Sequence, residues 1–315
     1  MPATRASVAP TDLLLLLFLG AVWGGAFLFF RIAGPEVGPV WAAEARVTIA
    51  ALTLAVVGLP TARRTLAGRW RQVVVLGAFM SAIPFSLIAF ATTTLPTGLG
   101  ALLNATAPLF TVLVGAAWVG DRVGSRTAVG LALGLFAVPV AVGFGPLELG
   151  PDTLLAAAAS LGAAFSYAIG GIYARLRLRD MPPVSLATGQ LASAAILLLP
   201  VAMLTGTPGV PSAGGIVSLL ALGTVSTALA WPLYFGVTGR TSPTAASTVT
   251  FVVPVFGIAW GAIALGEPVG LGVVGGFVLV LASLVLVLGL RVPVPAVARR
   301  VLIPRRAALR PSAAG

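Results

Sequence analysis

The 315-residue sequence contains no cysteine, no histidine and no lysine. Without cysteine it forms no disulfide and has no thiol nucleophile, and without histidine it lacks the commonest general base and a frequent zinc ligand. Its eight carboxylates are scattered along the chain, and its glycine-rich stretches lack the lysine of a phosphate-binding loop. We therefore expect no enzyme activity, no metal and no cofactor.

Charge of either sign is also scarce, and apolar residues take its place. Hydrophobic residues make up 58% of the sequence and charged residues 9%, and the mean hydropathy is +1.07. A soluble globule of this length needs more polar surface, so the composition predicts a chain embedded in lipid. The net charge of +11 comes from 19 arginines, whose placement indicates a membrane surface as partner and not nucleic acid.

One pattern of proline, glycine and an acidic residue occurs twice, and each member of the second copy lies 146 positions after its partner. A proline is followed by glycine seven residues on, then by Gly-acid-x-Val-Gly, and then by another glycine. The copies are Pro108, Gly115, Gly120, Asp121, Val123, Gly124, Gly130 and Pro254, Gly261, Gly266, Glu267, Val269, Gly270, Gly276. We interpret the chain as an internal duplication, which is typical of transporters.

Breaks at glycine, proline and arginine clusters divide the chain into ten apolar segments, and a membrane span takes about 20 such residues. The segments are 12–32, 38–58, 72–92, 98–118, 127–145, 152–173, 184–205, 214–237, 244–265 and 270–290. This predicts an all-α polytopic membrane protein. Its parts are a cytoplasmic N-terminus (1–11), two five-helix repeats (12–145 and 152–290) and a basic cytoplasmic tail (291–315).

The arginines predict the orientation of these segments. With the N-terminus inside, all but two of the 19 arginines fall in inner loops and tails; the exceptions are Arg31, outside, and Arg46, within the second segment. The positive-inside rule then places both termini in the cytoplasm, in the cytoplasmic membrane. Because each repeat has five segments, an odd number, the second repeat enters the membrane from the opposite side. The repeat is therefore inverted, which permits alternating access. The tail lies against anionic headgroups or is disordered.

Polar and aromatic side chains inside the spans are the candidates for substrate binding, because they are costly in lipid. Thr224, Thr227, Trp231 and Tyr234 follow helical spacing in the eighth segment. The first segment carries Trp23 and Phe27, and the sixth carries Tyr167. Two hydroxyls and several rings suit a small organic molecule. The alternative for these residues is helix packing, or for Tyr234 a place in the aromatic belt at the headgroups.

Two prolines fall inside spans at repeat-equivalent positions, Pro108 and Pro254. A proline removes one backbone hydrogen bond, so the carbonyls four residues earlier, at Asn104 and Thr250, lose their usual donor. The prolines are candidate pivots and cavity walls, and static kinks are the alternative. The amide of Asn104 is a further candidate for substrate contact.

The charged residues near or within spans have several possible roles. Glu44 and Arg46 point in different directions on the second segment, so each needs a partner elsewhere. Arg46 is expected to tie helices together, whereas Glu44 is the candidate for proton coupling if there is any; its repeat counterpart is Gln190. Asp121 and Glu267 follow helix ends, and we expect each to cap the helix after it.

These features together resemble the EamA-type transporters of the drug/metabolite transporter superfamily, over about residues 12–290. The resemblance implies a ten-helix inverted-repeat fold, a central cavity lined mainly by the first, third, fourth, sixth, eighth and ninth helices, and movement of small metabolites such as amino acids without ATP. Asp121 stands where the family usually has glutamate, and Glu44 is outside its usual pattern. The motifs are Trp23-Gly24 followed by Phe27, Arg46 in the second segment, and the repeated motifs ending at Asp121 and Glu267.

The sequence therefore predicts a secondary transporter that moves small organic metabolites, amino-acid-like or aromatic, outward across the membrane by alternating access. Its expected partners are the substrate and the lipid bilayer, with anionic headgroups at the arginine-rich inner loops and tail. A facilitative channel and a membrane scaffold that transports nothing are the alternatives. A membrane enzyme is a more remote one, because no catalytic cluster is present. The oligomeric state stays open.

Overall fold

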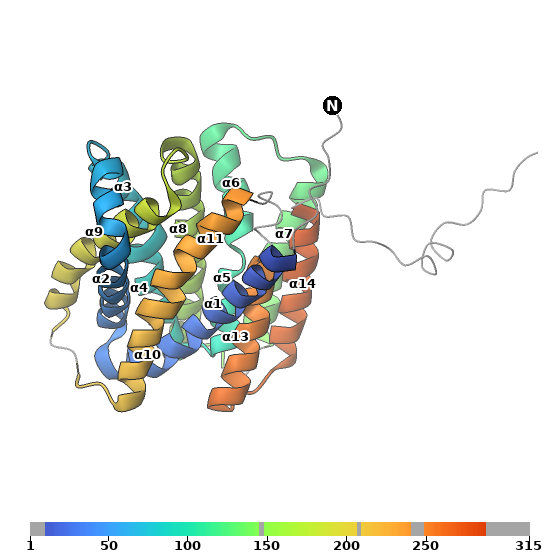
Figure 1. The fold of residues 1–315 in the computed structure, drawn as a ribbon. Helices are drawn as coiled ribbons and strands as arrows, with labels where there is room; N and C mark the ends of the chain where they lie inside the picture. Colours follow the sequence, from blue (N-terminus) through green and yellow to red (C-terminus); the bar gives the residue numbers. More distant parts are fainter. Residues whose placement is uncertain (1–9, 145–147, 207–208, 241–248, 288–315) are drawn as a thin grey trace, which may run out of the picture.

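The computed structural model describes residues 10–144, 148–206, 209–240 and 249–287 (Figure 1). The first nine residues and the basic tail predicted at 291–315 lie outside this part of the chain, and the side chains of Arg63, Arg64 and Arg240 are outside it as well. Within it the chain is helical and contains no strand.

The helices fall into two halves. The first contains α1 (Pro10–Val37), α2 (Pro39–Leu66), α3 (Trp70–Gly77), η1 (Ala78–Ala82), α4 (Ile83–Thr94), α5 (Thr97–Asn104), α6 (Ala107–Val119) and α7 (Ser125–Gly143). The second contains α8 (Pro151–Arg177), α9 (Pro183–Leu204), α10 (Ala213–Gly223), η2 (Thr224–Leu229), α11 (Ala230–Arg240), α13 (Val249–Leu265) and α14 (Leu271–Val287). The short π-helical segment η1 joins α3 to α4 without a break, and η2 joins α10 to α11 in the same way. Each of these two rods is therefore a single span.

Eight stretches of described helix are long and apolar enough to cross a membrane. They correspond to α1, the first part of α2, α3–α4, α5–α6, α7, α8, α9 and α10–α11. The apolar helices α13 and α14 have 17 residues each and adjoin residues that the structure does not describe. The prediction of an all-helical membrane protein with ten apolar segments is confirmed for this part of the chain.

The two halves repeat each other element by element. With the shift of 146, the first residue of α7 matches that of α14, the last residue of α6 matches that of α13, and η1 matches η2. The matched elements run in opposite directions: in Figure 1, α3 begins at the upper face, whereas its counterpart α10 begins at the lower face. The arrangement is the predicted inverted repeat.

Glycine contacts between α7 and α14 display the two-fold relation directly. A side chain at Gly130 on α7 would collide with the carbonyl of Ser283 on α14, and a side chain at Gly276 on α14 would crowd the carbonyl of Ala137 on α7. Ser283 is the repeat partner of Ala137, so the contact is reciprocal. Small residues let these helices approach closely, as in other membrane bundles. The counterparts α2 and α9 also pack against each other.

The repeated proline-to-acid motif forms the end of a helix. Gly120 and Gly266 adopt left-handed φ angles of 76° and 64°, a region that glycine enters without steric cost. The next residue then donates its backbone N–H to a carbonyl six residues earlier, over 3.3 Å from Asp121 to Gly115 and 3.1 Å from Glu267 to Gly261. The left-handed glycine thus folds the chain back over the last turn of the helix and supplies a donor to a carbonyl there, which explains the fixed spacing of glycine and acid.

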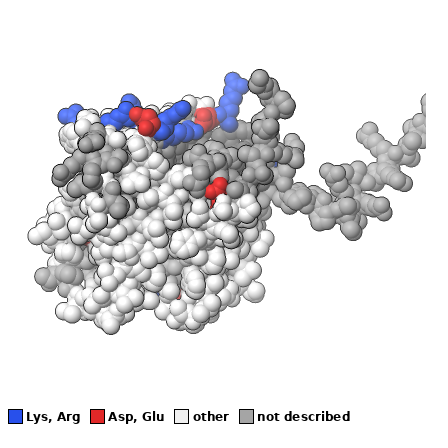
Figure 2. All heavy atoms as spheres, in the orientation of Figure 1, with Lys and Arg blue, Asp and Glu red and all other residues white. Residues whose placement is uncertain are grey.

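Exposed arginines gather on one face of the molecule. On the side shown in Figure 2, the visible basic side chains lie along the upper edge, where α3 begins in Figure 1. The exposed arginines of the described chain are Arg71, Arg122, Arg126, Arg175, Arg177 and Arg179. Below this edge the visible surface is almost entirely uncharged, as expected of a surface that faces lipid.

Candidate functional site

Four aromatic rings from α1 and α11 form a cluster between the two halves. Trp23 on α1 lies 5.6 Å from Trp231 and 5.2 Å from Tyr234, measured between ring centroids. Phe235 lies 5.4 Å from Trp231 and 5.9 Å from Tyr234. We call these four residues the aromatic cluster. The structure thus brings together three predicted site residues. Trp23 lies more than 200 positions before the other two, and Trp231 and Tyr234 belong to one helical stripe.

The two indoles of the aromatic cluster differ in hydrogen bonding. Trp23 donates from Nε1 to the backbone carbonyl of Ser226 over 3.2 Å. Trp231 is only 6% exposed, yet its buried Nε1 has no hydrogen-bond partner among the described residues. Because a buried indole N–H usually finds an acceptor, this donor is available to a bound molecule.

Arg46, at the same depth, is 4% exposed. Its Nε donates to the hydroxyl of Thr227 over 2.7 Å, and its Nη2 lies 3.5 Å from the carbonyl of Ser226. The guanidinium carbon lies 3.7 Å from the ring centroid of Phe85 and 5.2 Å from that of Phe30. Arg46 therefore joins α2 to η2, in keeping with the expected structural role, and its cation rests on aromatic faces.

Glu44 and Arg46 do not form an ion pair with each other. Glu44 accepts a 2.5 Å hydrogen bond from Thr48 on its own helix, and its Oε2 is buried without a partner in the described chain. The repeat counterpart of Glu44, Gln190 on α9, donates instead to Ser81 of η1 over 2.9 Å. Ser81 is the counterpart of Thr227, so each half presents a hydroxyl from its π-helical segment to a polar side chain of the other half.

The π-helical segments were not predicted from the sequence. A π turn is wider than an α turn and is often found at functional sites; here it moves Thr224 and Thr227 apart. Thr227 contacts Arg46, whereas Thr224 donates its hydroxyl to the Leu220 carbonyl and does not join this contact. The signal in the sequence was the glycine pair Gly77 and Gly223, which directly precede the two segments.

The other predicted site residues lie around this centre. Phe27 and Tyr167 pack into the same apolar core as Trp231, and Tyr167 lies within electrostatic range of Arg46. Asn104 is the last residue of α5, with a buried Oδ1 that no described residue contacts by a hydrogen bond. No described contact links Asn104 to the aromatic cluster.

The two prolines are not structurally equivalent. The span around Pro108 is broken into α5 and α6, and Pro108 occupies the first turn of α6, a position that suits proline because no N–H is needed there. Pro254, by contrast, lies inside the continuous helix α13. The first half thus has a break where the second has an unbroken helix.

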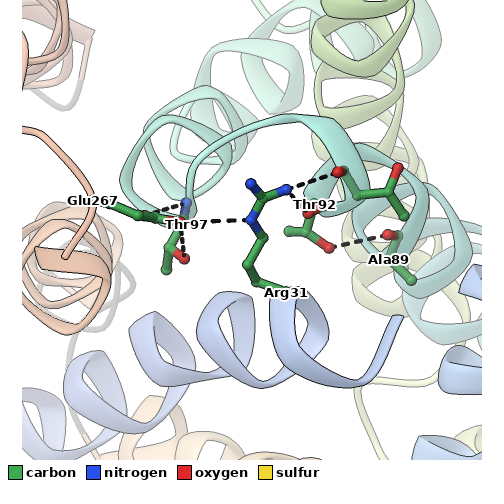
Figure 3. Close-up of polar contacts among 6 residues, drawn as sticks. Arg31, Ala89, Thr92, Thr97 and Glu267 are labelled. Carbon is green, nitrogen blue, oxygen red and sulfur yellow. Dashed lines mark hydrogen bonds and ion pairs between the residues drawn. The ribbon is translucent and has the colours of Figure 1, made fainter. Parts of the chain in front are cut away.

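A second polar site joins the halves at the end of α1, and Figure 3 shows it. Arg31 places its Nε 3.7 Å from the Oε1 of Glu267. The Nη1 of Arg31 donates to the carbonyls of Thr92 and Thr93 over 2.9 and 2.7 Å, at the end of α4. Glu267 in turn accepts from the backbone N–H of Thr97 over 2.8 Å and from its hydroxyl over 3.2 Å. We call these residues the outer latch, after the orientation proposed below.

The predicted capping roles of the two repeated acids differ from what is observed. Glu267 binds the first residue of α5, so it caps a helix of the other half and not α14, the helix that follows it. The N-cap residue of α7 is Gly124, which makes no side-chain cap bond. Asp121 instead lies 3.5 Å from Nη2 of Arg175 on α8. Packing between the halves brings these partners nearer than the following helix.

The pair formed by Asp121 and Arg175 is more exposed to solvent than the outer latch. Both side chains are 57% exposed, whereas those of Arg31 and Glu267 are 30% and 14% exposed. By the repeat, the counterpart of Arg31 is Arg177, an exposed residue. The two ends of the molecule are therefore unequal: the end with Glu267 is tied by a largely buried group of contacts, and the end with Asp121 carries solvent-exposed ion pairs, which contribute little each.

A further ion pair connects the loop before α3 to the loop before α9. Nη1 of Arg69 lies 2.7 Å from Oδ1 of Asp180. This hydrogen bond lowers the pKa of Asp180 and raises the pKa of Arg69. At the start of α10, the counterpart of α3, Glu36 accepts from the backbone N–H and the hydroxyl of Ser212. In both halves the start of this rod is thus held by an acid from the corner between the first two helices of the other half.

The comparisons with known proteins agree with this architecture. The model of the EamA-like transporter family matches residues 11–143 and again 154–289. A chain of known crystal structure superposes with a TM-score of 0.64 over 93% of this chain and 99% of the other, at 18% sequence identity. At that identity the likeness concerns the fold alone.

Two bacterial relatives extend over nearly the whole length. An uncharacterized transporter of Bacillus subtilis, YvbV, is 27% identical, with 91% of this chain and 92% of the relative covered. A probable amino-acid metabolite efflux pump of Salmonella typhimurium is also 27% identical, with 89% of this chain and 96% of the relative covered. Both carry names of transporters, which is consistent with the scarcity of catalytic groups noted in the sequence.

Proposed function

The chain belongs to the EamA-like transporter family, and from this premise we propose that it exports small amino-acid-like or aromatic metabolites across the plasma membrane by alternating access. That it is a multi-pass membrane transporter and not an enzyme follows from the family and from the relatives. The substrate class, the direction and the mechanism are our proposal. The observation that carries it is the aromatic cluster beside Arg46, between two inverted halves.

The composition of this centre supports an aromatic or amino-acid-like substrate. Large rings bind apolar and aromatic groups through their faces, and the hydroxyl of Thr227 and the N–H of Trp231 add polar specificity. Arg46 supplies a single positive charge at this depth. A substrate with several negative charges, such as a sugar phosphate, would need more cations than this centre offers.

The unequal ends of the molecule support alternating access. In inverted repeats the halves can exchange conformations, so that the contacts of one end are made when those of the other are broken. The outer latch is largely buried and is reinforced by hydrogen bonds to α4 and α5, whereas the ion pairs Asp121–Arg175 and Arg69–Asp180 at the other end are exposed to solvent. This is the pattern expected of a carrier that is closed at the end with Glu267 and looser at the end with Asp121.

The face with exposed arginines supports an orientation with the loops before α3 and α9 in the cytoplasm, because basic loops are retained inside. In that orientation the outer latch closes the external side. The name of the Salmonella relative, a probable efflux pump, favours export. Both termini then lie inside, as the sequence predicts.

Flux measurements on proteoliposomes test the proposal. A panel of labelled amino acids is loaded, and flux is measured with and without unlabelled solute on the opposite side. A carrier shows saturation and counterflow, whereas a channel shows neither. Absence of flux for every solute in correctly oriented vesicles, with protein that is folded, would overturn transport of this substrate class and favour the scaffold alternative.

A further inference from the structure

Arg46 is a buried cation that has no anion. Among the described residues, ion pairs join Arg31 to Glu267, Arg69 to Asp180 and Arg175 to Asp121, and Arg46 has none. A buried charge is costly unless it is paired, and a charged residue inside a membrane span is by default a functional candidate. The contacts with Phe85 and Thr227 reduce this cost without supplying a negative charge.

The donors of Arg46 are only partly used. A guanidinium has five N–H groups in one plane and no acceptor, and the described contacts engage Nε and Nη2. Thr227, which receives the Nε bond, also donates to the carbonyl of Leu222 over 2.6 Å. This second bond fixes the hydroxyl and therefore the plane of the guanidinium. The remaining donors are arranged in the fork that matches a carboxylate.

The aromatic cluster and Arg46 meet at one atom. The carbonyl of Ser226 accepts from Nε1 of Trp23 and lies within 3.5 Å of Nη2 of Arg46. Trp231 lies five residues further along the same rod, and its buried N–H has no acceptor among the described residues. The centre thus combines a cation without an anion, an indole donor without an acceptor, and ring faces, all within a few residues of Ser226.

We propose, on the basis of the proposed transport function, that Arg46 binds the carboxylate of the substrate. The transported compounds are then small monocarboxylates with an aromatic or apolar body, aromatic amino acids included. The carboxylate satisfies the charge of Arg46, and the body of the molecule packs on Trp23, Trp231 and Tyr234. Arg46 is in this case a substrate-binding residue and not merely a tie between α2 and η2.

The test uses two probes of equal size and different charge. Phenylacetate carries the carboxylate, and phenylacetamide replaces it with a neutral amide. A ligand that binds the folded state alone raises the thermal midpoint, so both are titrated against the full-length protein in detergent. We expect phenylacetate to stabilise the wild type and to bind about tenfold or more tightly than phenylacetamide, since a charge-assisted hydrogen bond is the stronger kind.

Two variants assign the effect to Arg46. In Arg46→Gln the preference for phenylacetate over phenylacetamide should vanish, and in Arg46→Lys, which keeps the charge but loses the fork, a reduced preference should remain. Equal binding of both probes by the wild type, or an unchanged preference in Arg46→Gln, overturns the proposal. If Arg46→Gln does not fold, Arg46→Lys decides, because an arginine with a purely structural role predicts no change in preference.

The carboxylate site at Arg46 and the transport function can be refuted separately. If proteoliposomes carry labelled amino acids but phenylacetate is not preferred, transport stands and the carboxylate site is refuted. If phenylacetate is preferred through Arg46 but no solute crosses the membrane, the site stands and the transport function is refuted.

Discussion

Arg31 on α1 and Glu267 after α13 connect the two halves of the chain, with 3.7 Å between Nε and Oε1. Glu267 belongs to the connection from α13 to α14, which lies at the lower end in Figure 1, away from the upper edge where the visible basic side chains gather in Figure 2. Glu267 holds the start of α5 and Arg31 the end of α4, so one pair of side chains ties together four spans of both halves. The equivalent acid at the other end, Asp121, is 57% exposed and pairs with the equally exposed Arg175.

The topology can be tested with a matched pair of cysteines, because the natural chain has none. Val123 and Val269 are repeat counterparts and are 39% and 49% exposed. Val123→Cys should react with a membrane-impermeant maleimide only after the cells are opened, and Val269→Cys should react in intact cells. Labelling of both from one side would contradict the inverted repeat.

Glu267→Gln should lower the stability of the folded protein. It removes charge-assisted hydrogen bonds to Thr97 and the negative charge at the start of α5, which together contribute about 1–3 kcal/mol. Asp121→Asn is the matched control, since that acid is largely solvated and its loss should be nearly neutral. Thermal unfolding in detergent measures both; equal destabilisation by the two variants would show that the ends of the molecule do not differ.

Breaking the outer latch should also open the external side. We expect Arg31→Gln to increase, by roughly threefold or more, the rate at which an impermeant maleimide reacts with a cysteine placed at Ser226. An increase of that size needs a change of less than about 1 kcal/mol in the free-energy difference between the closed and open states. The background variant Ser226→Cys alone gives the reference rate. An unchanged or lower rate would show that the outer latch does not control access to the centre.

Trp231→Ala should impair transport. Trp231 contacts the rings of Trp23, Tyr234 and Phe235, and each such aromatic contact contributes about 0.5–1.5 kcal/mol, so transport efficiency should fall about tenfold or more. Trp118 is the matched control, because it is 52% exposed at the surface. Equal flux in Trp231→Ala and Trp118→Ala would remove the aromatic cluster from the binding site.

The Arg69–Asp180 pair predicts a small dependence on pH. The pKa of Asp180 is lowered by the hydrogen bond from Arg69, so the pair stabilises the folded state above the unfolded pKa of aspartate, about 3.9. This contribution is lost as the pH falls through the lower, folded pKa. The thermal midpoints of the wild type and of Asp180→Asn should therefore differ slightly at neutral pH and converge in acid. A difference that is as large in strong acid, well below the unfolded value of about 3.9, as at neutral pH would assign it to another cause.

Part of the candidate site could be read from the sequence. Trp23, Trp231 and Tyr234 are candidates from the sequence because polar and aromatic side chains inside spans point to a binding site. The spacing argument grouped Thr224 with Thr227, however, and the structure separates them because η2 is a π-helix. Helical periodicity assumes 3.6 residues per turn, so it fails where the turn is wider.

The outer latch could not be predicted. Asp121 and Glu267 were conspicuous as repeated acids after helix ends, and local reasoning assigned each to the helix that follows. Their actual partners, Arg175 and Thr97, lie on other helices. Nothing in the local sequence around Glu267 indicates that α5 will begin beside it, because that contact joins residues 170 positions apart.

The sequence by itself determined the ten apolar segments, the duplication and its inversion. These depend on hydrophobicity along the chain and on the odd number of spans in each half, which are properties of the order of residues. Only the tertiary structure decided which side chains meet: that Arg46 reaches Thr227, that Arg31 and Glu267 close one end, and that the break at Pro108 has no counterpart at Pro254. Such contacts depend on how helices distant in sequence pack, and in a uniformly apolar chain many different packings would bury the same residues.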